Sequence, residues 1–260
     1  MKETWTSRGV FWFTVVTVFF SFCLIGLGGL VTSKEAGLTV HDWPTSLGNH
    51  MFLLPFDLWV GRDNWGVFLE HSHRLLASIV GLLTAGLTSW FWIREAKGVT
   101  RIIALVGTVI PLGLLGVRTE EMFVIMAIAA VLMIVFSAYK ILKNRNAKRW
   151  WATMAYSMVI VQGVLGGYRV LVHYVDLRPN LANQIGIFHG TLAQVFLIVL
   201  ALIALFSSNW WRKARVASNP NEQVPRVVRA HFLYATILVL LQLVIGATMR
   251  HQHNGLAVWD

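Results

Sequence analysis

The sequence is poor in charged residues, and this scarcity limits the class of protein that it can encode. Only 13 % of the 260 residues are charged and 56 % are hydrophobic, whereas about a quarter of the residues of a soluble domain are charged. Cysteine is nearly absent. Cys23 is the only one, which excludes a disulfide within the chain and any cysteine-based metal cluster. Because Cys23 lies in an apolar segment, we interpret it as a small packing residue.

The apolar residues occur in blocks long enough to cross a bilayer, which takes about 20 residues of helix. Seven such blocks are bounded by charged residues, Gly, Pro or Asn: 10–32, 72–94, 102–117, 121–142, 150–171, 184–207 and 229–249. The first is too long for a signal peptide and lacks a small-residue cleavage site, so we expect it to be retained as a helix. The sequence therefore predicts an all-α polytopic transmembrane bundle with about seven spans.

The net charge of +10 orients the chain rather than indicating a nucleic-acid partner. With the N-terminus in the cytoplasm, fifteen of the 22 basic residues fall in cytoplasmic segments, as the positive-inside rule requires. We therefore expect a multi-pass protein of the cell inner membrane, in contact with the lipid bilayer and not with nucleic acid.

A repeat links the outer ends of the first and last spans. Segments 28–42 and 246–260 align at a constant offset of 218 residues. Five positions are identical, with Gly28, Gly37, Leu38, Val40 and Asp42 matching Gly246, Gly255, Leu256, Val258 and Asp260. Duplicated helical units are common in membrane proteins. We expect pseudo-symmetric halves: an N-terminal half at 1–207, a flexible cytoplasmic linker at 208–228, and the first helix of an incomplete second half at 229–260.

Two histidines lie inside predicted spans, where an ionisable side chain indicates a functional site. His73 begins the second span and His189 lies about two turns into the sixth. Because these spans run in the same direction, both histidines are expected near the outer surface at similar depth. Such a pair is suited to bis-histidine ligation of haem iron in a helical bundle. The alternative for each is an interfacial histidine that contacts water or a headgroup.

Glu70 and Arg74 flank His73, and the spacing of Glu70 and His73 places both on one helix face. A carboxylate there can orient a ligand histidine, relay protons or act on a substrate. Arg74 is a candidate for pairing with a propionate of the porphyrin. The alternative for Glu70 is a solvated acid at a helix N-terminus.

The fifth span ends in a glycine-rich segment that includes Gln162, Gly163, Gly166 and Gly167. The spacing of Gly163 and Gly167 allows close helix packing, and it would also leave room for a flat macrocycle. Arg169 adds a positive charge at the outer rim. Of the other histidines, His251 and His253 form an His-x-His pair, but two ligands do not make a metal site, so we expect a solvated loop.

These motifs together resemble the haem A synthase family of bacterial and mitochondrial inner membranes. The matching stretches are Gly28-Gly-Leu-Val-Thr, Ala36-Gly-Leu, Asp42-Trp-Pro44, Glu70-x-x-His73-Arg74, Gln162-Gly-Val-Leu-Gly-Gly167, His189-Gly-Thr-Leu-Ala-Gln194 and Gly246-Ala-Thr-Met-Arg-His251. Their order and topology cover about three quarters of the chain.

The resemblance implies two four-helix bundles, each with a bis-histidine site: haem O as substrate in the first and a haem b cofactor in the second. It implies Glu70 as the catalytic residue, and His73 and His189 as iron ligands. Gln162, Gly166, Gly167 and Arg74 would line the cofactor site. The expected reaction oxidises a porphyrin methyl to a formyl. Expected partners are haem O synthase, terminal oxidase assembly factors, a quinol or other electron partner, and a second copy of the chain.

The sequence departs from the family pattern in three respects. An additional pair of spans occupies about 102–142, the first outer loop has no cysteine pair, and the helices that would hold the second histidine pair do not follow. We therefore expect a C-terminally truncated member that lacks the haem b site and is inactive alone. The rival hypotheses are a bis-histidine cytochrome that only carries electrons, and a transporter with a polar path.

Overall fold

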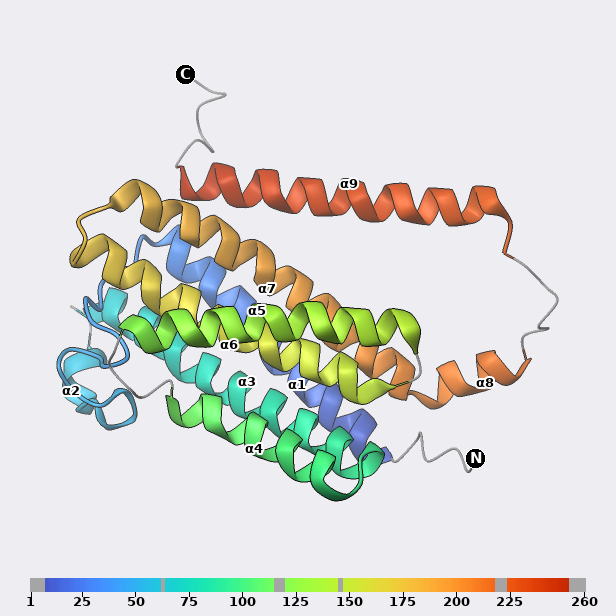
Figure 1. The fold of residues 1–260 in the computed structure, drawn as a ribbon. Coiled ribbons are helices and arrows are strands. Elements are labelled where there is room, and N and C mark those ends of the chain that lie inside the picture. Colours follow the sequence, from blue (N-terminus) through green and yellow to red (C-terminus); the bar gives the residue numbers. More distant parts are fainter. Residues whose placement is uncertain (1–7, 62–63, 115–119, 145–146, 218–223, 253–260) are drawn as a thin grey trace.

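The computed structural model describes residues 8–61, 64–114, 120–144, 147–217 and 224–252. Within these residues the chain is helical and contains no strand, only an isolated bridge between Ser46 and Asn49. The predicted all-α class is confirmed, and Figure 1 shows long helices that run side by side.

Six helices are long and apolar enough to span a membrane. They are α1 (Arg8–Ser33), α3 (Trp65–Glu95), α5 (Glu120–Lys143), α6 (Lys148–Tyr174), α7 (Pro179–Ser207) and α9 (Arg226–His251). The remaining predicted span, 102–117, corresponds to α4 (Gly98–Leu114), which is apolar but has only 17 described residues. At 1.5 Å per residue α4 is about 26 Å long, slightly less than the hydrocarbon core. Residues 115–117 of that prediction lie outside the described residues.

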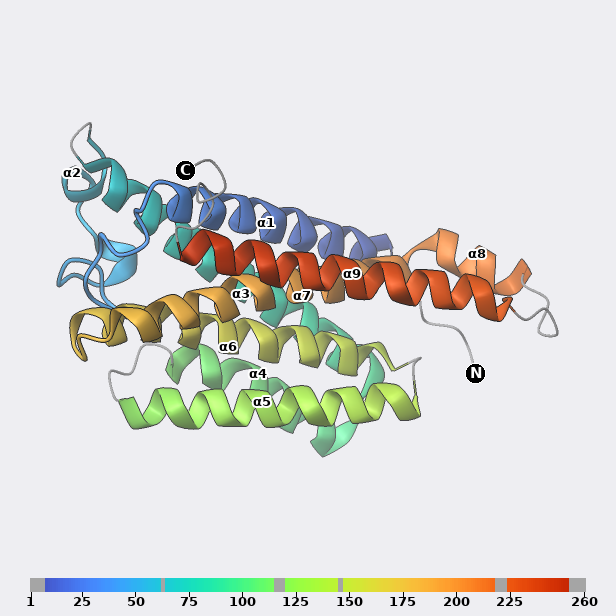
Figure 2. The ribbon, with the colours of Figure 1, turned by 90° about the horizontal axis from the view of Figure 1, so that it is seen from above.

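Four of these helices form a bundle. Helix α1 packs against α3 and α7, and α6 packs against the same two helices. The predicted additional pair lies outside this bundle, with α4 against α3 and α5 against α6. Helix α9 lies at the opposite side, along α7 and α1, as the view from above shows (Figure 2). The pair therefore flanks the bundle without separating its helices.

Small and hydroxyl-bearing residues bring the bundle helices together, as they do in membrane proteins generally. On α1 the fully buried Thr14 and Thr17 donate to the carbonyls of Val10 and Phe13, one turn earlier. On α3, Thr88 reaches across to the carbonyl of Ala152 on α6, 3.0 Å away. These hydroxyls are satisfied within the protein, so they can be buried away from water without penalty.

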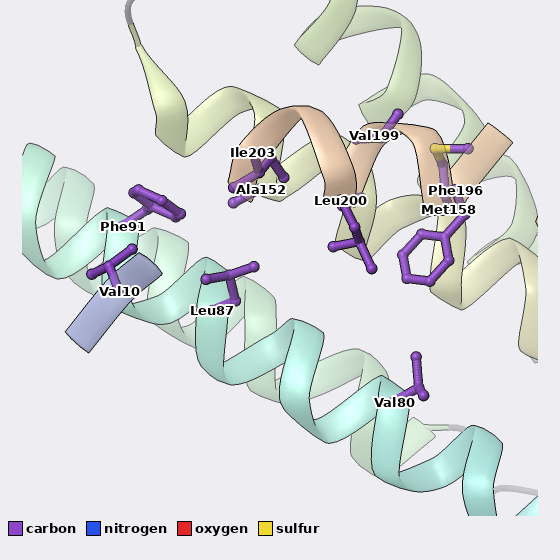
Figure 3. Packing of buried hydrophobic residues seen from close by; sticks show 11 residues of the cluster. Val10, Val80, Leu87, Phe91, Ala152, Met158, Phe196, Val199, Leu200 and Ile203 are labelled. Carbon is purple, nitrogen blue, oxygen red and sulfur yellow. The ribbon is translucent and has the colours of Figure 1, made fainter. Parts of the chain in front are cut away.

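A cluster of apolar side chains fills the half of the bundle towards the inner end (Figure 3). Its members come from α1, α3, α6 and α7: Val10, Val80, Leu87, Phe91, Ala152, Ala155, Met158, Phe196, Val199, Leu200 and Ile203. The inner ends of α3 and α6 are joined by Arg149, whose guanidinium donates to the carbonyl of Glu95 over 2.7 Å. This cluster packs the four bundle helices together below their outer end.

Three short helices lie outside the bundle. The loop between α1 and α3, here called the outer loop, contains η1 (Met51–Leu53) and α2 (Phe56–Trp59), and α8 (Asn209–Ala217) follows α7. The predicted linker at 208–228 contains α8 in its first part, and its last residues, 226–228, begin α9. Ser208 caps this helix, with its hydroxyl oxygen accepting from the backbone N–H of Trp211 at 3.0 Å. Such a cap stabilises a helix that hydrophilic composition alone does not indicate. Residues 218–223 of the predicted linker lie outside the described residues.

Candidate functional site

His73 on α3 and His189 on α7 lie in one region at the outer end of the bundle. Their imidazoles interact electrostatically with each other, so they do not lie on opposite sides of the molecule. The Nδ1 atom of each is buried and has no hydrogen-bond partner. Two buried imidazoles that lie near each other, on two helices of one bundle, are what a shared ligand between them requires.

Each of these rings packs against a glycine of a neighbouring helix. A Cβ at Gly28 of α1 would lie 2.9 Å from Cε1 of His73, and a Cβ at Gly166 of α6 would lie 3.3 Å from Cε1 of His189. The first distance is shorter than side chains tolerate, so Gly28 cannot be replaced without moving the ring. The sequence predicted Gly166 in the site but gave Gly28 no contact with a histidine.

Gln162 fixes the backbone at His189. Its side-chain amide donates to the carbonyl of His189 over 2.9 Å, and its Oε1 is buried without a partner. Gln162 and Gly166 are one turn apart on α6, and both contact His189. Gly167 differs from them, because its surface is covered by the indole of Trp43 from the outer loop. Gly167 thus accommodates the loop in this structure.

Glu70 is buried, with only 4 % of its surface exposed. Its Oε1 accepts from Arg74 at 2.7 Å, and its Oε2 accepts from the backbone N–H of Val40 at 2.8 Å. The hydroxyl of Thr39 lies 3.1 Å from the same Oε2. The alternative of a solvated acid is therefore wrong for Glu70, which is held by the loop and by Arg74.

Arg74 uses both of its terminal nitrogens inside the protein. Nη1 donates to the carbonyls of Asp42 and Thr45, at 2.7 and 3.0 Å. Nη2 donates to the carbonyl of Val40 at 2.9 Å as well as to Glu70. Arg74 therefore clamps the outer loop onto α3, and the propionate predicted for it would have to replace one of these acceptors.

The outer loop folds back over the end of the bundle, where Trp43 covers Gly167 of α6. Asp42 organises its turn, since its two oxygens accept from the backbone N–H groups of Leu47 and Gly48 at 2.7 and 2.9 Å. Burial alone would raise the pKa of the Asp42 carboxyl, but the hydrogen bonds from Thr45, Gly48 and Leu47 and the nearby Arg74 outweigh it and lower that pKa. Trp43 extends from this turn to Phe123 of α5, with 4.5 Å between ring centroids.

The sequence did not indicate the contacts that two further residues make in this region. Arg169 of α6 interacts electrostatically with His73, His189 and Glu70. His251 was predicted to be solvated, but it ends α9 and packs on Gly186 of α7, where a Cβ would lie 2.6 Å from its Cε1. The available signal for Arg169 was its spacing from Gln162 and Gly166 on one helix face. His253 lies outside the described residues.

No group of three or more His, Cys, Asp or Glu side chains among the described residues is placed to hold a metal ion. The two histidines suit instead an iron that brings its own equatorial nitrogens, as a porphyrin does. Their proximity and their packing on Gly28 and Gly166 are compatible with both imidazoles holding the iron of such a group.

The fold and site define a polytopic all-α membrane protein with a paired-histidine site at one end of its bundle. Residues 122–260 match the model of the cytochrome oxidase assembly protein family, so the chain belongs to that family. The match contains Gln162 and His189, whereas Glu70 and His73 precede it.

Curated relatives include heme A synthases of Brucella. That of Brucella anthropi is 32 % identical over 132 residues, which cover 47 % of this chain and 36 % of the relative. That of Brucella ovis is 33 % identical over 127 residues, which cover 45 % of this chain and 34 % of the relative. The chain thus spans about a third of the length of the curated relatives it matches. No solved structure matches the chain.

Proposed function

We propose that this chain binds haem O at the outer end of its bundle and acts in a haem A synthase-type oxidation of a porphyrin methyl to a formyl. The observation that carries the proposal is the pair of neighbouring imidazoles, His73 and His189, each seated on a glycine and each with a buried, unpartnered nitrogen. Membership of the cytochrome oxidase assembly protein family and the names of the Brucella relatives support it.

In this proposal His73 and His189 would hold the iron of the substrate haem. Gln162 keeps His189 in place through its backbone carbonyl, and Gly28 and Gly166 provide the space in which the two rings lie. Bound haem supplies the redox chemistry that side chains alone lack.

Glu70 is proposed as the group that takes up a proton released when the methyl is oxidised. The Thr39 hydroxyl lies 2.9 Å from the carbonyl of Ala36 and 3.1 Å from Oε2 of Glu70. A hydroxyl has one proton, so it donates to one of the two at a time. When Thr39 donates to Ala36, its oxygen can accept a proton carried on Oε2. A protonated Glu70 therefore has a hydrogen-bond partner ready, and Arg74 stabilises the ionised form.

The finer features of the proposal follow from the family. The reaction would take place in the cell inner membrane and serve terminal oxidase assembly, with haem O synthase, assembly factors and a quinol or other electron partner as neighbours. A haem b cofactor would belong to a second bundle of the pseudo-symmetric protein, and a homo-oligomer is the remaining partner we propose.

Glu70→Gln tests the enzyme against an electron carrier. We expect the purified full-length protein with this change to keep the low-spin haem spectrum and to lose formyl porphyrin in extracted pigment, measured by mass. Asp57→Asn, an exposed acid of α2, is the matched control and should keep both. Unchanged formyl product in Glu70→Gln would reject the role of Glu70. Electron transfer without formyl product in the unchanged protein would favour the carrier.

His73→Ala and His189→Ala test the ligands. Each should abolish the low-spin spectrum of reconstituted haem, because an iron left with one axial imidazole changes spin state. His231→Ala, an exposed histidine near the inner end of α9, should leave the spectrum unchanged. Normal spectra in both site variants would defeat the haem assignment.

A further inference from the structure

Two arginines lie beside the histidine pair, and their surroundings differ. Arg74 donates to four acceptors of the protein, three loop carbonyls and Glu70. Arg169 has a buried Nε without a hydrogen-bond partner. A buried guanidinium donor that remains unpaired is unfavourable, so Arg169 is the arginine of this region that lacks a partner suited to its charge.

The position of Arg169 on α6 directs it to the histidines. Gln162, Gly166 and Arg169 are spaced by four and three residues, which places them on one helix face. The first two contact His189, through its carbonyl and its ring. Arg169 interacts electrostatically with both His73 and His189. One face of α6 therefore lines the space between the two imidazoles and ends in a positive charge on its outer side.

The guanidinium of Arg169 packs against Gly37. A Cβ at Gly37, just beyond α1, would lie 3.1 Å from its Nη1, so a larger residue there would crowd it. The carboxylate of Glu70 attracts Arg169, but both oxygens of Glu70 are occupied by Arg74, Val40 and Thr39. The structure thus holds the charge of Arg169 at the outer rim of the site with donor capacity left over.

We infer that Arg169, and not Arg74, binds a carboxylate of the tetrapyrrole held between His73 and His189. This inference rests on the proposed function. Guanidinium and carboxylate form two parallel hydrogen bonds in a charge-assisted pair, and the propionates are the carboxylates of a haem. The macrocycle then lies with its propionate edge at the outer rim beside Arg169 and its apolar edge towards the apolar cluster of the bundle. The site therefore selects the free acid over an esterified porphyrin.

Binding of haem and of its dimethyl ester to the full-length protein, each titrated spectroscopically, tests the inference. The unchanged protein should bind iron protoporphyrin IX more tightly than the ester. Arg169→Gln should weaken binding of the free acid by about 10- to 100-fold, the size of a lost charged hydrogen bond, and should leave ester binding unchanged. Arg169→Lys, which keeps the charge but not the paired geometry, should lie between the two.

Arg178→Gln is the matched control, because Arg178 is an exposed arginine at the same end of the bundle. It should retain the full preference for the free acid. Equal binding of acid and ester by the unchanged protein, or an undiminished preference in both Arg169 variants, overturns the inference while the histidine ligands stand. A spectrum insensitive to His73→Ala and His189→Ala overturns the proposed function itself. The two failures are thereby distinguishable.

Discussion

Helices α1 and α9 have related sequences at their outer ends but occupy different environments. Helix α1 lies inside the bundle and contacts α3, α7 and α9, whereas α9 lies along its edge and has no buried residue. The matched glycines show the difference most clearly. Gly28 supports the ring of His73, and a Cβ at Gly246 would meet nothing within 4 Å.

Side-chain size at matched positions accounts for the difference. The offset of 218 pairs the buried Thr14 and Ser21 of α1 with Phe232 and Val239 of α9, which are 73 % and 59 % exposed. Small side chains let helix backbones approach within a bundle, and large apolar ones suit a face towards lipid. The repeat thus preserves the outer-end motif, while each helix face is adapted to its own neighbours.

The largest contrast is expected from Gly28→Leu and Gly246→Leu. Leucine at Gly28 must displace the ring of His73, so we expect at least a 10-fold loss of haem affinity and a destabilisation of about 1–3 kcal/mol from overpacking. Leucine at Gly246 should change the free energy of unfolding by less than about 0.5 kcal/mol. Haem titration and thermal unfolding in detergent measure both. Equal effects would show that α1 and α9 are not packed as described.

A smaller contrast is expected from exchanging the residues at another matched pair. Thr14→Phe places a ring where the side chain is fully buried, at a cost of about 1–3 kcal/mol, with little effect on haem unless α1 shifts. Phe232→Thr should cost less than about 0.5 kcal/mol, because its hydroxyl can bond the carbonyl one turn earlier, as Thr236 does. Thermal unfolding of the two variants measures both losses of stability. A larger loss in Phe232→Thr would contradict the exposed position of this face.

The contact between the two helices gives the third prediction. At their outer ends Arg250 of α9 donates to the hydroxyl of Ser33 of α1, and His251 packs on Gly186. Cysteines introduced at 33 and 250, with Cys23 replaced by Ala, should be joined efficiently by a short thiol cross-linker. Adding Gly186→Leu should push His251 away and lower the yield several-fold. A yield unaffected by Gly186→Leu would mean that α9 is held elsewhere.

The smallest effect concerns the loop that follows α1. The pKa of Asp42 is lowered in the folded protein, so its contribution to stability is present above the unfolded pKa and is lost as the pH falls through the folded one. The effect should be below about 1 kcal/mol, because the carboxyl is partly solvated. Asp42→Asn should flatten this part of the stability profile, measured by thermal unfolding from pH 3 to pH 7. An unchanged profile would show that Asp42 does not contribute to the pH dependence of stability. Its repeat partner Asp260 lies outside the described residues.

Much of the architecture could be predicted because its signals are local. Apolar blocks of spanning length predicted the six long helices. The direction of the helices placed His73 and His189 at the same end. These inferences need only hydropathy, helix length and alternating direction. Helix α8 was missed because its cap, Ser208, is a single residue in a hydrophilic segment.

The contacts of individual side chains could not be predicted in the same way. Arg74 follows His73 in sequence and was expected to face a ligand, but the loop supplies three carbonyls that the sequence does not place. Gly167 and Gly166 are adjacent, yet one contacts Trp43 and the other His189, because neighbouring helix positions point in different directions. Such choices depend on tertiary packing between distant segments.

The helix pair α4 and α5 makes the two flanks of the histidine site unequal. One flank, formed by α3 and α6, is covered by α4 and α5, and the other, formed by α1 and α7, is bordered by α9, which has no buried residue. An amphiphile dissolved in the membrane would meet two further helices of this chain on its way to the imidazoles from the first flank, and α9 on its way from the second.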